Sequence, residues 1–257
     1  MELTNDQKQA LYTDGFVALP GIVPQERVDA ALRAINASLG ERGMAPDDLP
    51  ILRARSYAPE VQGTPAITDL LTATPLWEVA ESAIGAGKIR PATSGQIALR
   101  FPSMEPARGA HPHIDGMYSP TNGVPKGEIR NFTALVGVFL SDVLSDNAGN
   151  LSVWPGTHAL HAEYFRREGS QALLNGMPQV TLPAPLQVKA RAGDAILAHY
   201  TLAHGITGNE SPHIRYAIFF RLTHVDHDTM KWESMTDIWR EWAGMQEIAR
   251  GAVSAQH

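Results

Sequence analysis

Apolar residues recur every three or four positions in the first part of the chain. After Pro24 these positions are Val28, Ala31, Leu32 and Ile35. The spacing places them on one face of a helix, and a proline is well tolerated at a helix start. Upstream, Thr4 and Gln7 match a capping box, which predicts a short helix that ends before Gly15. The pattern therefore predicts a helical N-terminal part over about residues 1–88.

From residue 89 onward, short apolar runs alternate with Gly, Pro and Asn positions that favour turns. Runs of this kind are typical of antiparallel strands. The strands predicted in this way span residues 96–101, 132–140, 151–154, 187–190, 195–199 and 216–222. We therefore expect a β-sandwich or barrel over about residues 89–225.

Two further helices are predicted, one inside the β-rich part and one after it. Leu160 and Phe165 indicate a helix within residues 157–178, and the segment of about 232–250 has helical spacing of its apolar residues. We find neither an internal repeat nor a low-complexity linker. The pattern therefore predicts one domain over residues 1–257, mainly β with flanking α-helices.

Composition narrows the class of partner. The chain has 257 residues, of which 44% are hydrophobic, and it is long enough to bury a substantial core. A formal net charge of -6 without a long basic block argues against nucleic acid or an anionic membrane as partner, so we expect a small-molecule substrate. There is no cysteine, so nitrogen and oxygen atoms must hold any metal. Without an apolar leader or a membrane-spanning stretch, we expect a cytoplasmic protein of undetermined oligomeric state.

Three potential metal ligands lie in the β-rich part. His113 and Asp115 are separated by one residue, and His204 follows the predicted strand 195–199. In a strand, His113 and Asp115 would project from the same face. A second strand must then bring His204 to that face. Two imidazoles and one carboxylate on one side of an ion leave the opposite positions open, which is the ligand set of non-haem Fe(II) oxygenases.

Several motifs stand in order around these ligands. They are residues 11–17 (LYTDGFV) leading to Pro24, residues 149–158 (GNLSVWPGTH), residues 193–199 (GDAILAH), His204-Gly205, Asn209 and Arg215. In this order they resemble the phytanoyl-CoA dioxygenase family of Fe(II)/2-oxoglutarate-dependent oxygenases, over most of the chain. A His-x-Asp motif alone is frequent by chance, whereas its order with the distal histidine and the later arginine is specific.

The resemblance implies a double-stranded β-helix core of the jelly-roll or cupin type. It also implies Fe(II) on His113, Asp115 and His204, with 2-oxoglutarate and O2 as cosubstrates and with succinate and CO2 as products. Related halogenases replace the carboxylate ligand with a small residue. The presence of Asp115 therefore favours hydroxylation of a C–H bond.

The resemblance further implies residues that bind the cosubstrate. Arg215 is expected to hold the far carboxylate of 2-oxoglutarate, since a planar guanidinium can bind a carboxylate through two parallel hydrogen bonds. The family often has a hydroxyl two residues after the distal histidine, where this chain has Ile206, so Thr207 is the expected substitute. Gln96 and Thr133 lie on strands expected to line the pocket and are further candidates.

Substrate contacts are predicted from position alone. On a continuous strand His111 would share the face of the first metal ligand, although Pro112 interrupts regular pairing. Arg55, and Tyr118 in the loop of residues 116–130, are candidates to cover the mouth of the pocket. Loops of this kind vary freely on a common scaffold, so the substrate itself is not predicted.

Other polar and aromatic residues are interpreted as structural. His199 is interpreted as a buried histidine with satisfied hydrogen bonds, and His158 as part of the Pro-Gly-Thr-His turn. Asp194 follows a glycine, which favours a turn over a role as hydrogen-bond acceptor for a metal-binding histidine. Tryptophans expected to pack in the core are Trp232, Trp239 and Trp242.

Two other functions remain open from the sequence. A metalloenzyme of the cupin type that does not use 2-oxoglutarate would explain the three ligands but not Arg215. A non-catalytic binding protein on the same scaffold need not keep all three ligands. The oxygenase interpretation explains the ligands and the arginine together.

Overall fold

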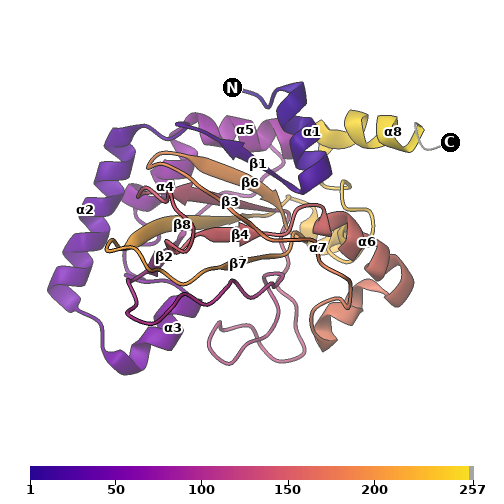
Figure 1. Cartoon of the computed structure of the whole chain (residues 1–257). Helices are drawn as coiled ribbons and strands as arrows, with labels where there is room; N and C mark the ends of the chain where they lie inside the picture. Colours follow the sequence, from indigo (N-terminus) through magenta and orange to yellow (C-terminus); the bar gives the residue numbers. More distant parts are fainter. Residues whose placement is uncertain (255–257) are drawn as a thin grey trace.

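The strands form two antiparallel sheets, with helices around them (Figure 1). The computed structural model describes residues 1–254. In this part of the chain the larger sheet has the strand order β1-β6-β3-β8-β2 and the smaller sheet has the order β5-β4-β7. The strands are β1 (Phe16–Leu19), β2 (Gln96–Arg100), β3 (Ala134–Phe139), β4 (Leu151–Val153), β5 (Leu186–Gln187), β6 (Ala195–His199), β7 (His204–Ile206) and β8 (Arg215–Leu222). The core is a double-stranded β-helix, as predicted.

Helices connect the strands and cover the larger sheet. Those described within residues 1–254 are α1 (Asn5–Asp14), α2 (Gln25–Arg42), α3 (Leu49–Ala54), α4 (Pro65–Thr72), α5 (Pro75–Ile84), α6 (Thr157–Glu168), α7 (His227–Met230) and α8 (Gln246–Ser254). Short 3-10 turns are η1 (Pro46–Asp48), η2 (Ser170–Asn175), η3 (Glu233–Met235) and η4 (Ala243–Met245). None of the helices in this described part is long and apolar enough to cross a membrane.

Successive residues of the central strand β3 enter different apolar clusters. Val136 and Val138 pack in the cluster that includes the N-terminal helices, whereas Leu135 and Phe139 pack in the cluster between the two sheets. Alternate side chains of a strand point to opposite faces, so β3 is buried on both faces. This explains why the sequence of β3 is continuously apolar, with no polar face.

The first two helices form as the sequence predicts. Thr4 and Gln7 make both hydrogen bonds of the capping box of α1. Gly15 ends this helix with a φ of 81°, a left-handed conformation that favours glycine. Helix α2 begins directly after Pro24 and buries Val28, among other residues, on one face. The predicted helix within residues 157–178 is confirmed as α6.

The prediction of a wholly helical N-terminal part is wrong, because this part also contains a strand. Strand β1 follows Gly15 and pairs with β6 at the edge of the larger sheet, with Phe16 opposite Ala198. A strand of four residues has too few positions for its alternation to identify it in the sequence. Its conformation is decided by the backbone hydrogen bonds with β6, which lies far along the chain.

The predicted C-terminal helix over about 232–250 is wrong in its extent. The chain forms two 3-10 turns there, and α8 begins only at Gln246. Trp242 has a non-helical backbone, and a Cβ atom on Gly244 would lie 1.8 Å from the Ser82 carbonyl oxygen. The close approach of this segment to α5 therefore replaces the helix that the spacing of Trp239 and Trp242 favoured, although both tryptophans pack in the core as expected.

Candidate metal centre

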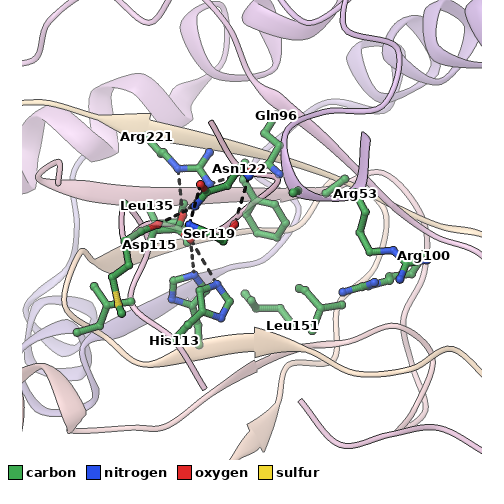
Figure 2. A pocket seen from close by; sticks show the side chains of 18 of the residues that line it. Arg53, Gln96, Arg100, His113, Asp115, Ser119, Asn122, Leu135, Leu151 and Arg221 are labelled. Carbon is green, nitrogen blue, oxygen red and sulfur yellow. Dashed lines mark hydrogen bonds and ion pairs between the residues drawn. The ribbon is translucent and has the colours of Figure 1, made fainter. Parts of the chain in front are cut away.

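A cavity of about 390 Å³ contains all three predicted metal ligands (Figure 2). Strands β2 and β8 of the larger sheet contribute Gln96 and Phe219, and strands β4 and β7 of the smaller sheet contribute Leu151 and Ile206. The loop 116–130 adds several polar residues on the remaining side. The cavity therefore lies where both sheets and this loop meet.

His113, Asp115 and His204 direct their ligand atoms to one point. The Oδ1 atom of Asp115 lies 3.4 Å from Nε2 of His113 and 3.6 Å from Nε2 of His204. The ligand atoms of the three residues all lie within 4.8 Å of one another. Figure 2 shows the carboxylate of Asp115 above the imidazole ring of His113. Two imidazoles and one carboxylate in this arrangement suit a divalent metal that keeps open coordination positions.

The backbone brings these ligands together although His113 and Asp115 do not lie in one continuous strand. His204 begins β7, and it exchanges backbone hydrogen bonds of 2.9 and 3.1 Å with His113. Of residues 111–115 only His113 pairs in this way, and Asp115 already lies in a turn. Gly116 follows with a φ of 81°, and a Cβ atom there would lie 2.2 Å from the Arg130 carbonyl oxygen. The turn is therefore imposed by the close approach of residue 130.

Backbone carbonyls orient both histidines. Nδ1 of His113 lies 3.3 Å from the carbonyl oxygen of His111, and Nδ1 of His204 lies 3.0 Å from that of Leu202. Each Nδ1 therefore donates its proton to a carbonyl oxygen, so that Nε2, which faces Asp115, can give up its own proton and offer its lone pair to a metal. The acceptors that the sequence did not identify are thus main-chain atoms. Asp194 is not one of them, because its carboxylate accepts hydrogen bonds from the backbone N–H groups of Gly21 and Arg191.

Arg221 is a residue of this site that the sequence analysis missed. Its Nε and Nη2 atoms donate hydrogen bonds of 3.0 and 2.6 Å to Oδ2 of Asp115. Nη2 also donates to Oε1 of Gln96, at 2.8 Å. A signal was present, since Arg215 and Arg221 are an even number of residues apart on one strand and so share a face.

The charges around Asp115 favour its ionised form. Burial raises the pKa of Asp115, but the charge of Arg221 and the hydrogen bonds from both histidines outweigh this effect and hold the pKa well below its usual range. For His113, burial lowers the pKa, but the hydrogen bond and charge of Asp115 outweigh it and raise the pKa. The carboxylate is therefore ready to bind a cation at neutral pH.

Arg215 lines the same cavity and is nearly fully buried, at 3% exposed. Its Nε and Nη1 atoms donate to the carbonyl oxygens of Gly149 and Ala98, at 2.8 and 3.0 Å. Burial and the neighbouring Arg100 lower its pKa to about 9. No acid within residues 1–254 forms an ion pair with it. A buried guanidinium without an acidic partner is a suitable site for a carboxylate ligand.

Two of the other predicted residues, Gln96 and Tyr118, also line the cavity. Gln96 lines it and accepts the hydrogen bond from Arg221. Tyr118 lines it from the loop 116–130, with about half of the residue exposed. Oδ1 of Asn122 accepts a hydrogen bond from the backbone N–H of Ser119, which joins two parts of this loop. The loop was expected to cover the mouth, and its residues do line the cavity.

Four of the residues predicted to contact cosubstrate or substrate are not among the residues that line the cavity. The hydroxyl of Thr133 donates to Glu241, and Thr207 is buried with its hydroxyl 3.5 Å from the Asn150 carbonyl oxygen. The backbone of His111 orients His113, but its exposed side chain is not part of the lining. Arg55 binds the Thr121 carbonyl oxygen, and Arg53 lines the cavity instead.

The two histidines interpreted as structural lie outside the cavity lining. Nε2 of His199 lies 2.8 Å from the Ile238 carbonyl oxygen, and its ring stacks on Trp242. Nε2 of His158 lies 2.9 Å from the Tyr12 carbonyl oxygen. Both histidines therefore join secondary-structure elements.

A comparison with known proteins identifies a family to which this chain is similar. The model of a family described as "Phytanoyl-CoA dioxygenase (PhyH)" matches residues 11–217. A comparison with curated protein sequences finds no match. The matched segment contains every metal ligand and Arg215.

Several solved structures are similar over most of their length. EctD from S. alaskensis, solved with 2-oxoglutarate and 5-hydroxyectoine, is 19% identical, with 87% of this chain and 77% of that chain covered and a TM-score of 0.58. The epimerase SnoN from nogalamycin biosynthesis is 21% identical, with coverages of 85% and 79% and a TM-score of 0.57. HygX from Streptomyces hygroscopicus, solved with nickel and 2-oxoglutarate, is 18% identical, with coverages of 88% and 88% and a TM-score of 0.56. At these identities the likeness shows a common fold.

Proposed function

Because this chain belongs to the phytanoyl-CoA dioxygenase family, we propose that it is an Fe(II)- and 2-oxoglutarate-dependent oxygenase that hydroxylates a C–H bond of a small molecule. One observation carries the proposal. The metal-binding atoms of His113, Asp115 and His204 converge in a cavity that also contains the unpaired guanidinium of Arg215. The ligands alone would fit other metalloenzymes, but the buried arginine needs an anion.

The donor set fits Fe(II). The Nε2 atoms of His113 and His204 and the Oδ1 atom of Asp115 would hold the ion and leave positions open for 2-oxoglutarate and O2. Bound Fe(II) would supply the reduction of O2 that is coupled to decarboxylation of 2-oxoglutarate to succinate and CO2. Neighbours solved with 2-oxoglutarate support the choice of cosubstrate.

The remaining residues of the site bind the cosubstrate and orient the metal ligand Asp115. Arg215 holds the far carboxylate of 2-oxoglutarate, and its burial excludes water from that ion pair. Arg221 occupies Oδ2 of Asp115, so that Oδ1 is left for the metal. Gln96 holds Arg221 in this position through a hydrogen bond.

Hydroxylation is the proposed outcome among several that this fold supports. The similar structures include an epimerase and a carbocyclase, so the fold does not decide the reaction. The carboxylate ligand Asp115 favours oxygen transfer over halogenation. One oxygen atom of O2 enters succinate in any such turnover, so the test is incorporation of the second ¹⁸O atom from labelled O2 into the oxidised substrate. An oxidised substrate without the label would contradict hydroxylation.

The class is tested by anaerobic titration of Fe(II)-loaded protein with 2-oxoglutarate. We expect the weak visible charge-transfer band that chelation of the metal produces. In Arg215→Ala, checked for folding by circular dichroism, binding should weaken by about tenfold or more, because a hydrogen bond to a charged group is worth about 1.5–3 kcal/mol. The measurement is the 2-oxoglutarate concentration at half-maximal absorbance.

Two neighbouring histidines give a matched control for the same experiment. His113→Ala should lose the band, because one of the three ligands is removed. His111→Ala should keep it, because the carbonyl oxygen of residue 111 remains to orient His113. If iron-replete wild-type protein shows no band, a cupin-type metalloenzyme that does not use 2-oxoglutarate becomes the better explanation.

A further inference from the structure

The cavity contains more positive charge than its own acid can balance. Of the described residues that line it, four are arginines and one, Asp115, is an acid. Arg221 is ion-paired with Asp115. Within residues 1–254 no acid forms an ion pair with Arg53, Arg100 or Arg215. Unpaired guanidinium groups in one cavity favour the binding of anions.

Arg100 and Arg215 are held directly opposite each other. They are partners across β2 and β8, and a Cβ atom on Gly149 would lie 2.8 Å from Cβ of Arg100 and 3.2 Å from Cβ of Arg215. Like charges opposite each other destabilise a sheet. Burial and the charge of Arg53 lower the pKa of Arg100. The fold thus tolerates a repulsion that bound anions would relieve.

The three arginines lie at different depths. Arg215 is buried, Arg100 is partly buried and Arg53, on α3, is exposed. Figure 2 shows Arg53 beside Arg100, on a side of the cavity away from His113. Arg215 donates to two backbone carbonyls, whereas the guanidinium groups of Arg100 and Arg53 donate no hydrogen bond to other residues in the described part of the chain. The outer two therefore keep their donors free.

We propose that Arg100 and Arg53 bind an anionic group of the substrate, a carboxylate or a phosphate, and so select small acidic molecules. The inference rests on the proposed function, in which the far carboxylate of 2-oxoglutarate occupies the deeper Arg215. That carboxylate carries a single charge, which leaves the outer two arginines without a partner. Each guanidinium can bind an oxyanion through two parallel hydrogen bonds.

The size of the cavity agrees with a small substrate. Its volume of about 390 Å³ is near the lower end of the range of about 300–1,000 Å³ for small-molecule pockets. The cosubstrate must share this volume. Apolar side chains of Leu151 and Ile206 also line the cavity, so the substrate combines an anionic group with a compact apolar part.

The test is a calorimetric titration of anaerobic, Fe(II)-loaded protein that is saturated with 2-oxoglutarate, at low ionic strength. Inorganic phosphate and acetate are the probes, in separate arms, and the tighter arm identifies the anion. We expect a saturable site that weakens by about tenfold or more in Arg100→Met and in Arg53→Met, since hydrogen bonds between charged groups are among the stronger ones. The charge-transfer band of the 2-oxoglutarate complex is recorded on each protein before the titration. Its presence tests the proposed function separately from the binding of the probe.

Arg55→Met is the matched control. It removes the same charge two residues from Arg53, but Arg55 lies outside the cavity lining. We expect its affinity for the probe to remain within about twofold of wild type, because an exposed charge that does not contact the anion contributes little. The proposal is overturned if neither phosphate nor acetate shows a saturable site, or if the probe that binds competes with 2-oxoglutarate. It is also overturned if Arg55→Met loses as much affinity for the probe as Arg53→Met.

Discussion

At the scale of single residues, Asp115 divides its two oxygens between different partners. Oδ1 faces the two histidine nitrogens, and Oδ2 accepts both hydrogen bonds from Arg221. The guanidinium therefore prevents the carboxylate from turning both oxygens to a metal. Loss of a group that orients a metal ligand in this way typically lowers metal affinity by about 10–100-fold.

Substitution of Arg221 tests this role. In Arg221→Met the carboxylate is free to rotate, and we expect Co(II) to bind about 10–100-fold more weakly, as measured by calorimetry. Removing a positive charge opposes this loss, so the visible spectrum of the Co(II) protein is recorded as well. Only a reoriented carboxylate changes the ligand geometry and hence the spectrum. Arg221→Lys should restore part of the Co(II) affinity and part of the wild-type spectrum.

Arg27→Met provides the control for this prediction. Arg27 also forms an ion pair, with Asp69 at 2.8 Å, and its side chain is about as exposed as that of Arg221. This variant should bind Co(II) with wild-type affinity and spectrum, because the lost ion pair lies between α2 and α4. A wild-type Co(II) spectrum in Arg221→Met would show that Arg221 does not position Asp115.

At the scale of elements, Gly15 joins the first helix to the first strand of the sheet. It has a φ of 81°, and a Cβ atom there would lie 2.5 Å from Nδ1 of His158. His158 in turn contacts the carbonyl oxygen of Tyr12. The close approach of α1 to α6 therefore requires glycine for two separate reasons, backbone conformation and space.

Gly15→Ala should lower the free energy of unfolding by about 2–4 kcal/mol. About 1 kcal/mol comes from the left-handed conformation, and about 1–3 kcal/mol comes from displacement of the His158 ring. Urea denaturation measures the sum. Gly156→Ala is the control, because Gly156 has the same left-handed backbone (φ 78°, ψ -8°) and an added Cβ would lie 3.7 Å from the Thr13 carbonyl oxygen, an ordinary van der Waals contact. It should cost about 1 kcal/mol, and equal costs for the two variants would contradict the steric argument.

At the scale of the whole molecule, buried histidines join the sheet to the helices and to the C-terminal segment. Burial and the charge of His158 lower the pKa of His199 to about 3. Burial, together with the charge of His161, lowers the pKa of His158 to about 4. Both histidines are therefore neutral in the folded protein at pH values where the unfolded chain already binds protons.

Stability should consequently fall in mild acid. Above about pH 6.5 both histidines are neutral in the folded and unfolded states, and their contribution is fully present. Below that pH the unfolded state takes up protons first, and each histidine costs up to about 1.4 kcal/mol per pH unit until its folded pKa is reached. Urea denaturation at pH 7.5, 6.5 and 5.5 measures this loss.

His199→Gln separates this effect from the titration of other groups. Glutamine can both donate to the Ile238 carbonyl oxygen and accept from the Thr201 N–H, as His199 does, but it does not titrate. We expect this variant to be less stable than wild type at pH 7.5 and to lose less stability between pH 7.5 and 5.5. The exposed His213→Gln should follow the wild-type curve. Parallel curves for His199→Gln and wild type would exclude a contribution from His199.

The sequence by itself determined the parts that depend on local pattern and motif order. Alternating apolar runs predicted the strands of the β-helix core, and helical spacing with a capping box predicted α1 and α2. The order of His113, Asp115, His204 and Arg215 predicted which side chains would meet. These features are readable because each arises from residues close together in the chain, or from a motif whose members keep a constant order.

Only the tertiary structure decided which neighbours those residues meet. The ion pair between Arg221 and Asp115, the pairing of β1 with β6, and the turn of Thr133 toward Glu241 all join segments far apart in the chain. The same holds for the break before α8, where Gly244 packs against Ser82. In each case the outcome depends on the spacing and orientation of packed elements. A sequence pattern predicts the face of a helix or strand on which a side chain lies. It does not predict which residue of another element lies opposite that side chain, or at what distance.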